Sequence, residues 1–284
     1  MAEERANDEM GDDRLCYMVI KNGLVVYEHY RKGHTPSSLN AAFSTTKSLC
    51  ASLYGVAVHQ GWADPAELVR DRNDGTRQCN AETSFRHVLT MTGQSQDLAD
   101  PSFSYDASGL ACLDTLADFI DQNNPEGMTG AEWKDRYFTE ALGFEDSVWE
   151  DGPCDGCAER GHFPCGWGVQ ASCRDLARVG QLWVNEGRWG DEELADRGFI
   201  IDAGEWTYPT ALPPYGYTSW LRTEDPVDPS VAQFEGAGSQ SVFVSKAHQA
   251  VIVSMGEGAD SSGPVWNNVR EHIVSKEAAP PPQL

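Results

Sequence analysis

The sequence predicts an α+β protein in which an antiparallel sheet is flanked by helices, with a mostly helical domain inserted. A hairpin pattern stands near the N-terminus, helical patterns fill the middle, and short strand patterns return before the C-terminus. Because the early and late strands can complete one sheet, we expect residues 14–60 and 212–276 to form a discontinuous sheet domain. Residues 61–211 are then the helical domain, and residues 277–284 a disordered tail.

The first elements are a hairpin and a helix. Apolar runs at Leu15–Ile20 and Leu24–Tyr30 are separated by Lys-Asn-Gly, and Asn-Gly is a strong signal for a tight hairpin turn. From Ser44 to about His59, apolar residues recur near the 3.6-residue period of a helix.

The middle of the chain continues with helical patterns, most clearly at Ser172–Asn185, where Glu186-Gly187 follows as a stop signal. A closing amphipathic helix is predicted at Pro264–Val274. Between them, strands are predicted at Gly216–Arg222, Ser241–Val244 and Ala250–Met255.

The composition is that of a globular and strongly acidic protein. Its 284 residues carry 44 Asp plus Glu against 21 Lys plus Arg, a formal net charge of −23. A nucleic-acid surface needs clustered basic residues, so we expect no nucleic-acid partner. The sequence has no apolar run of about 18 residues, so we expect no membrane partner either. The acidity fits either a salty setting, where screening relieves self-repulsion, or simple colloidal solubility.

The compartment depends on the start of the native chain. The first residues are acidic and lack the apolar core of a signal peptide. We expect a cytoplasmic protein if Met1 is the native start, and otherwise a periplasmic or secreted protein with disulfides.

Eight cysteines leave three states open. One cluster has the spacing C-x2-C-x7-C-x7-C, which is compatible with a four-thiolate zinc site but lacks the second close pair of a zinc ribbon. Disulfides and free thiols explain the even number equally well. The cluster consists of Cys154, Cys157, Cys165 and Cys173.

The strongest candidate for chemistry is Ser44-Thr45-Thr46-Lys47. Serine and lysine three residues apart at a helix start lie on one face. A serine hydroxyl needs an adjacent base, and a lysine becomes one when burial lowers its pKa toward neutrality. The helix that follows is almost entirely apolar, so we expect Lys47 to be buried. The alternative is an N-cap serine beside a solvated lysine.

Five further segments accompany this pair in chain order. They are the hairpin Val19–Glu28, the loop His87–Gly93, the helix start Ser172–Arg178, the strand Tyr215–Trp220 and the turn Gly236–Gln240. Together with Ser44 and Lys47 they resemble the serine β-lactamase and penicillin-binding-protein superfamily, most of all class C-like esterases, D-peptidases and the 6-aminohexanoate-dimer hydrolase group. The resemblance covers about residues 15–275 and implies the β-lactamase/transpeptidase-like fold. It also implies that the turn at Gly236 precedes an edge strand beside the nucleophile.

The resemblance implies a second motif, Tyr-x-Asn, whose tyrosine relays protons with the lysine. The best match is the segment Phe103–Ser108, which places Tyr105 at the tyrosine position. Ala107 stands where Asn or Ser is usual, and its side chain cannot hydrogen-bond the lysine or a substrate amide. Ser108 is a candidate replacement, and a packed loop tyrosine is the alternative.

The third motif aligns with Phe234-Glu235-Gly236. The resemblance implies that the N–H groups of Ala237 and Ser44 form the oxyanion hole, and that Glu235, Gly236 and Trp167 contact the substrate. A β-lactamase places a cation here to hold the substrate carboxylate. Glu235 would repel it, so we expect weak β-lactamase or carboxypeptidase activity and a preference for neutral or cationic substrates. The alternative is that Glu235 faces solvent.

The sequence therefore predicts a serine hydrolase that cleaves small-molecule esters or amides through a Ser44 acyl-enzyme. Lys47 and Tyr105 supply acid–base catalysis, and we expect no metal and no other cofactor. The activity is expected to be that of an esterase or amidase more than that of a true β-lactamase. Two alternatives stay open: an acyltransferase on the same fold, and a non-catalytic ligand-binding homologue. The oligomeric state is not predicted.

Overall fold

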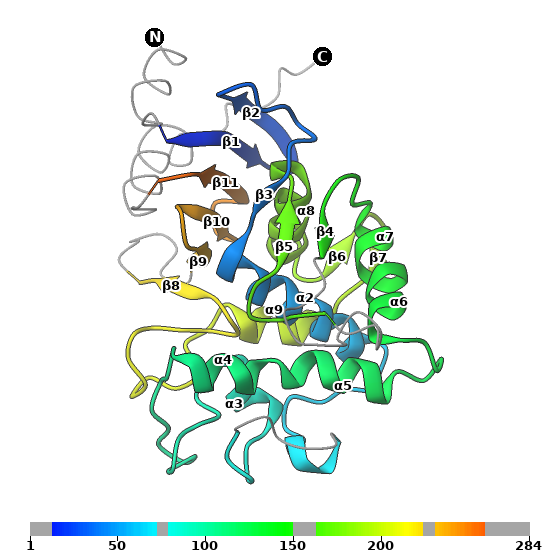
Figure 1. The fold of residues 1–284 in the computed structure, drawn as a ribbon, viewed down its shortest axis with the longest axis vertical. Helices are drawn as coiled ribbons and strands as arrows, with labels where there is room; N and C mark the ends of the chain where they lie inside the picture. Colours follow the sequence, from blue (N-terminus) through cyan, green and yellow to red (C-terminus); the bar gives the residue numbers. More distant parts are fainter. Residues whose placement is uncertain (1–12, 73–78, 150–162, 224–230, 259–284) are drawn as a thin grey trace.

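The computed structural model describes residues 13–72, 79–149, 163–223 and 231–258. Its main sheet is antiparallel and joins the two ends of the described chain (Figure 1). Because β1 pairs with β11, the prediction that early and late strands share one sheet is confirmed. In spatial order the strands are β2 (Leu24–Tyr30), β1 (Arg14–Lys21), β11 (Ala250–Gly256), β10 (Gln240–Ser245), β9 (Val231–Gly236) and β8 (Trp220–Arg222).

The predicted N-terminal hairpin is confirmed. Asn22 has φ 52° and Gly23 has φ 75°, so both residues of the turn adopt the left-handed conformation that Asn and Gly tolerate best. β1 is buried, whereas β2 exposes the first residues of its strand at the edge of the sheet.

The strands near residue 220 differ from the prediction. The predicted strand Gly216–Arg222 is reduced to β8, because Thr218 has φ 54° and its N–H donates to Leu89 O instead of a strand partner. β9 was not predicted, because nearly all its residues are buried on both faces and the sequence therefore lacks the alternation of a half-exposed strand.

The turn at Ala237–Ser239 joins β9 to β10. The expectation that an edge strand follows this turn is wrong, because β10 lies between β9 and β11. The edge strand on this side of the sheet is β8. The sequence predicted it only as the end of the longer strand Gly216–Arg222.

α8 (Cys173–Val184) covers one face of the sheet and packs on β11, β10 and β1. Ser172 caps this helix by accepting a hydrogen bond from the N–H of Asp175. Gly180 permits the close contact between α8 and β11, since a Cβ at this position would lie 2.5 Å from a methyl group of Val251. The predicted helix at Ser172–Asn185 is confirmed to within one residue at each end.

The long helix α2 (Thr46–His59) follows the 3₁₀ turn η1 (Phe43–Thr45) and is buried from Thr46 through Ala57. It contacts α5 and α9. The other described helices are η2 (Val69–Asp71), α3 (Phe85–Leu89), α4 (Ala107–Leu113), α5 (Thr115–Asn123), α6 (Gly130–Lys134), the π-helical η3 (Asp135–Thr139), α7 (Glu140–Leu142) and α9 (Arg197–Ala203). Figure 1 shows α3, α4 and α5 on the side of the molecule opposite the N-terminal hairpin.

Two small sheets complete the described elements. One has the order β3 (Asn40–Ala41), β5 (Val169–Ala171) and β4 (Val148–Trp149), and the other pairs β6 (Arg188–Trp189) with β7 (Glu192–Glu193). The first of them places β5 beside the segment that leads into η1. The predicted helix Pro264–Val274 and the tail 277–284 lie outside the described residues, and the division into two domains stays a prediction.

Six cysteines form three disulfides: Cys16–Cys173, Cys50–Cys165 and Cys79–Cys112, with Cα–Cα distances of 6.6, 5.5 and 4.9 Å. Two members of the cysteine cluster are thereby paired with residues outside it, so the four-thiolate zinc hypothesis is wrong. Cys154 and Cys157 lie outside the described residues. Disulfides are typical of oxidising compartments. No described helix is both long and apolar enough to cross a membrane.

Candidate active site

Ser44 and Lys47 are brought together where η1 passes into α2. The Nζ of Lys47 lies 2.7 Å from the Oγ of Ser44. Lys47 is only 2% exposed, as its place in an apolar helix predicts. The Nζ also donates a hydrogen bond of 2.7 Å to the carbonyl oxygen of Gly166. The alternative of a solvated lysine is therefore wrong.

Burial makes Lys47 a base near neutral pH. Desolvation lowers its pKa to about 7, against the opposing field of Asp114, which raises the pKa. A lysine with this pKa is largely neutral just above pH 7 and can accept the proton of Ser44.

Tyr105 is the third member of the site. Its ring centroid lies 4.9 Å from the Nζ of Lys47, and its side chain is hydrogen-bonded to Ser44. Burial raises the pKa of Tyr105, the bond to Ser44 lowers it, and the charge of Glu235 raises it, with a net increase. The phenol therefore holds its proton at neutral pH and is able to donate it.

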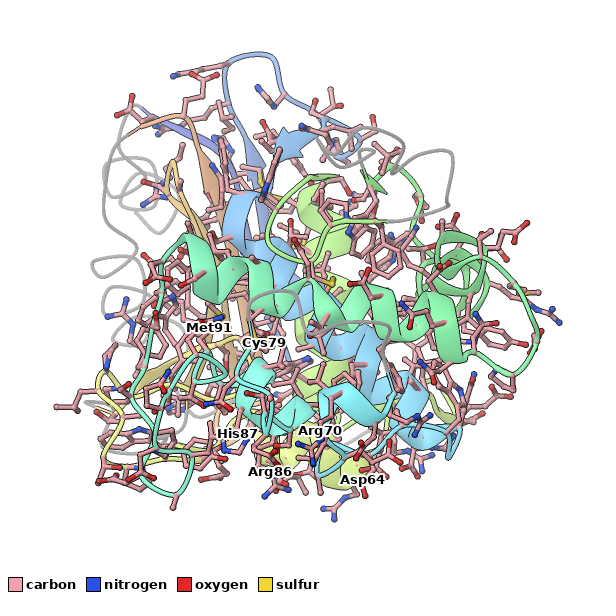
Figure 2. The ribbon with its side chains drawn as sticks, turned by 60° about the horizontal axis from the view of Figure 1, so that its bottom comes forward. Asp64, Arg70, Cys79, Arg86, His87 and Met91 are labelled. Atoms are coloured by element: carbon pink, nitrogen blue, oxygen red, sulfur yellow. A yellow bond between two sulfur atoms is a disulfide. The ribbon has the colours of Figure 1, made fainter. Side chains whose placement is uncertain are left out.

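The loop before α4 holds Tyr105 in place. The N–H of Ser104 donates to the carbonyl of Met91, in the loop that follows α3. His87 and Met91 are labelled on this part of the chain in Figure 2.

His87 closes a capping box with Ser84 at the start of α3, so it serves the local fold rather than the chemistry.

The position two residues after Tyr105 lacks a polar side chain for substrate. Ala107 is the first residue of α4. The hydroxyl of Ser108 donates to the Oδ1 of the N-cap residue Asp106, at 2.7 Å. The backbone N–H of Gly109 and, after it, this bond from Ser108 lower the pKa of Asp106 to about 2. Ser108 is thus engaged in capping and does not replace the missing Asn.

The end of β9 packs directly on the segment before the nucleophile. A Cβ on Gly236 would lie 2.3 Å from the carbonyl oxygen of Ala42, so only glycine fits. Glu235 is half-buried and lies close enough to Tyr105 for its charge to act on the phenol. Ala237 follows as an exposed turn residue. The strand thus brings the third motif to Ser44.

Two exposed aromatic residues lie beside this site. Phe43 precedes the nucleophile with φ 47°, a left-handed conformation that costs a bulky residue about 1–3 kcal/mol and is often found at functional sites. Its ring approaches the Gly238 position in the β9–β10 turn. Trp167 follows Gly166 and is 47% exposed. Phe43 was not predicted from the sequence, because no periodic pattern signals a positive φ.

An aromatic cluster extends the site away from Tyr105. Trp220 lies 5.5 Å from Tyr105 between ring centroids and is partly exposed. Behind them, Tyr215 contacts both Phe103 and Trp220. Apolar surface is thus available next to the reacting groups.

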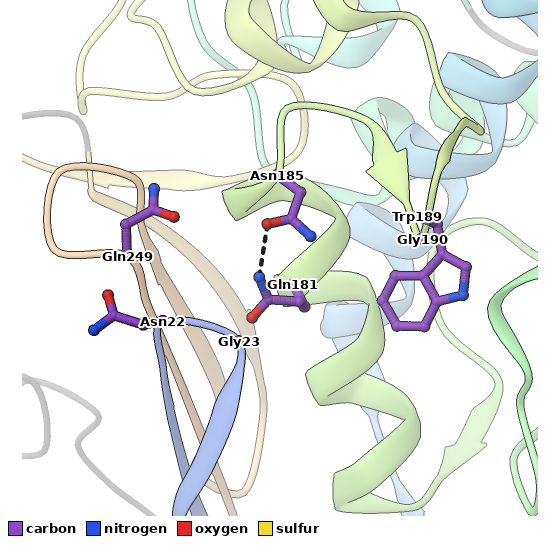
Figure 3. Close-up of a pocket in the computed structure, with 7 residues that line it drawn as sticks. All are labelled: Asn22, Gly23, Gln181, Asn185, Trp189, Gly190 and Gln249. Carbon is purple, nitrogen blue, oxygen red and sulfur yellow. Dashed lines mark hydrogen bonds between the residues drawn. The ribbon is translucent and has the colours of Figure 1, made fainter. Parts of the chain in front are cut away.

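A separate polar cavity of about 610 Å³ lies between the N-terminal hairpin and the end of α8 (Figure 3). Its lining combines carboxamide side chains with Trp189 and holds neither Ser44 nor Lys47. The contact between Ser44 and Lys47, rather than the size of a cavity, therefore defines the candidate active site.

Comparisons with known proteins concern the fold of the whole chain. No protein-family model matches the chain. A 6-aminohexanoate-dimer hydrolase from Paenarthrobacter ureafaciens is 22% identical over 325 residues, covering 96% of this chain and 79% of the relative. A solved structure from Bacillus anthracis, named after the same hydrolase, has a TM-score of 0.73 at 17% identity, with 96% of this chain and 81% of that chain covered. A β-lactamase from Mycobacterium bovis has a TM-score of 0.71 at 17% identity, with 97% and 98% covered.

The chain therefore has the fold of the serine β-lactamase and penicillin-binding-protein superfamily. The resemblance inferred from the motifs and the fold class is confirmed.

Proposed function

We propose that the protein is a serine hydrolase that cleaves esters or amides through an acyl-enzyme on Ser44. The observation that carries the proposal is the 2.7 Å distance between Lys47 Nζ and Ser44 Oγ at the start of a buried helix. The hydrolase names of two similar proteins support it.

In the proposed mechanism, Ser44 gives its proton to the neutral amine of Lys47 while its Oγ attacks the carbonyl carbon of the substrate. The N–H groups of Ser44 and Ala237 stabilise the oxyanion. As the tetrahedral intermediate collapses, the proton passes from Lys47 through Tyr105 to the leaving group. Water then attacks the acyl carbon and gives a proton to Lys47 and Tyr105. These groups return the proton to the Oγ of Ser44 as its bond to the acyl carbon breaks, which releases the acid and restores the free hydroxyl.

The proposed substrates are small neutral or cationic esters or amides. The carboxylate of Glu235 near Tyr105 disfavours a substrate that carries its own carboxylate there. Ala107 offers no side-chain hydrogen bond to a substrate amide. The partly exposed rings of Trp167 and Trp220 favour substrates with an apolar part.

The test compares wild type with Ser44→Ala. Intact mass is measured after incubation with a fluorophosphonate probe, and turnover is measured with p-nitrophenyl butyrate. We expect one adduct in wild type only and a loss of about 10⁴-fold or more in kcat for the variant. Turnover that survives in Ser44→Ala, or a folded wild type that forms no adduct, would contradict the proposal. Added alcohol or amine acceptors distinguish an acyltransferase, which would form acylated acceptor in place of acid.

A further inference from the structure

The segment Phe163–Val169 crosses the start of α2 and is bonded to it. The carbonyl of Gly166 accepts from the Nζ of Lys47 at 2.7 Å. Three residues later, the N–H of Val169 donates to the Oγ1 of Thr46 at 3.3 Å. We refer to Phe163–Val169 as the crossing segment. It supplies a hydrogen-bond acceptor to the lysine that lies beside the nucleophile.

The residue directly before Gly166 is fixed from two directions. Cys165 forms a disulfide with Cys50, which lies three residues after Lys47 on the same helix. Both half-cystines are completely buried. The backbone N–H of Cys165 donates to the Oδ1 of Asp114 at 3.1 Å, and Asp114 stands at the junction of α4 and α5.

We propose that Asp114 and the Cys50–Cys165 disulfide are positioning groups for the base, because together they hold the Gly166 carbonyl against Lys47. This inference rests on the proposed function, since it takes Lys47 as the proton acceptor. It adds residues that none of the three sequence motifs contains.

The physical reason lies in the geometry of a neutral amine. The amine of Lys47 has two N–H bonds and one lone pair, and only the lone pair accepts the proton of Ser44. A fixed carbonyl that binds one N–H directs the lone pair toward the serine. Without it, the flexible four-carbon side chain of Lys47 regains rotamer freedom, and the lone pair points toward Ser44 for a smaller part of the time. A loosened Gly166 carbonyl therefore lowers kcat more than it raises KM.

The charges around the amine come from three elements. Asp114 acts directly on Lys47 and opposes the effect of burial on its pKa. Tyr105 faces the amine from the loop before α4. Glu235 of β9 acts on Tyr105. A change at Asp114 therefore alters both the anchor of the crossing segment and the charge nearest to Lys47.

The first test removes the disulfide by the double substitution Cys50→Ala with Cys165→Ala. The matched control is Cys16→Ala with Cys173→Ala, which removes another buried, long-range disulfide that joins β1 to α8. With p-nitrophenyl butyrate, we expect kcat to fall about tenfold in the first variant, with KM within about twofold, and to stay near wild type in the control. Equal kcat values in the two variants would overturn the proposal.

The second test keeps the fold and needs no turnover. Asp114→Asn retains an oxygen for the N–H of Cys165 but removes the charge. Lysine labelled with ¹³C at Cε gives signals from the six lysines of the chain, of which Lys47 is assigned by Lys47→Ala. We expect the titration midpoint of Lys47 to fall by about half a pH unit or more in Asp114→Asn. An unmoved midpoint would show that Asp114 does not lie close to Lys47 and would overturn its role in the proposal, whereas failure of the proposed function is seen separately in Ser44→Ala.

Discussion

A Cβ on Gly236 would lie 2.3 Å from the carbonyl oxygen of Ala42. The last residue of β9 thus packs directly on the backbone that leads into Ser44, and no side chain fits between the two segments. Gly236→Ala must push β9 away from η1 and displace the N–H of Ala237, which the proposed mechanism assigns to the oxyanion. We expect kcat/KM for p-nitrophenyl butyrate to fall about 100-fold or more, because misplacement by about 1 Å is that costly.

The matched control is Gly204→Ala at the end of α9, where a Cβ would make only ordinary contacts, the nearest at 3.6 Å. Gly204→Ala is expected to keep wild-type kcat/KM. Activity in Gly236→Ala equal to that of the control would show that β9 does not form part of the site.

Burial of Lys47 is expected to lower the free energy of unfolding and, at the same time, to supply the neutral amine that the proposed activity needs. Its pKa of about 7 in the folded protein lies below the usual lysine value of 10.5. Between about pH 7 and pH 10.5 the unfolded chain therefore binds a proton that the folded chain releases. The resulting penalty on the fold grows as pH falls and is complete below about pH 7. Activity follows the neutral amine, so the acid limb of kcat/KM should have its midpoint near pH 7.

Lys47→Met removes this penalty. After the loss of the bond to Gly166, we expect the free energy of unfolding at pH 7 to rise by about 1–3 kcal/mol, with activity abolished. The gain should disappear near pH 10.5. Urea unfolding at several pH values measures it, with the exposed Lys32→Met as control. A Lys47→Met variant that is less stable than wild type at pH 7 would show that burial of the Lys47 amine does not destabilise the fold.

Glu235 is expected to select against anionic substrates. Glu235→Gln removes the charge near Tyr105 with little change of shape. We expect KM for a carboxylate-bearing ester to fall about threefold to tenfold and KM for its neutral analogue to stay within about twofold. Glu205→Gln, an exposed change with the same effect on net charge, controls for long-range attraction. Parallel behaviour of the two variants would place Glu235 away from the substrate.

Asp175 is expected to stabilise the fold through its charge. Its buried carboxylate accepts hydrogen bonds from the N–H groups of residues 145–147 and from the hydroxyl of Ser147. Burial acts to raise the pKa of Asp175, but these bonds outweigh it and the net pKa is lowered. The stability that the charge supplies is therefore present above the usual carboxyl pKa and is lost as pH falls through the lowered value.

Asp175→Asn leaves an amide where these donors need an acceptor. We expect a loss of about 2–4 kcal/mol in the free energy of unfolding at pH 7, which becomes smaller below about pH 4. Asp191→Asn, an exposed change, should have little effect. A pH-independent loss in Asp175→Asn would indicate that packing, and not charge, is what the substitution removes.

The cysteine pairing predicts the number of thiols. Of eight cysteines, six are paired in disulfides. Reaction with a thiol reagent in denaturant without reductant should therefore detect no more than two thiols per chain. A count above two in protein purified from an oxidising compartment would mean that at least one of the three disulfides is open.

The sequence predicted those parts of the site that depend on side-chain type at short spacing. Ser44 and Lys47 are three residues apart, and the apolar residues around Lys47 indicated its burial. The carbonyl of Gly166 gave no signal, because every residue carries a carbonyl and only the tertiary fold decides which one meets the lysine. Asp114 was missed for the same reason, since only the tertiary fold brings it to Cys165 and Lys47.

The fold shows the same division. The Asn22-Gly23 turn and the capped helix α8 follow local rules, and the sequence alone predicted both. β9 was not predicted, because burial on both faces removes the alternation of apolar and polar residues that marks a half-exposed strand. Spacing could not choose among the many pairings that eight cysteines allow. Those pairings depend on where β1 and α2 meet segments more than 100 residues away.

The place of β11 between β1 and β10 has a consequence for synthesis on the ribosome. The N-terminal hairpin emerges first but has no neighbour on its inner side until residues 250–256 have been made. β9, which completes the surroundings of Ser44, also comes late in translation. A nascent chain therefore contains Ser44 long before it can assemble the groups that surround it in the folded protein. Pairing over such separations folds slowly and leaves strand edges open to aggregation, so a nascent chain of this protein is a strong candidate for chaperone binding.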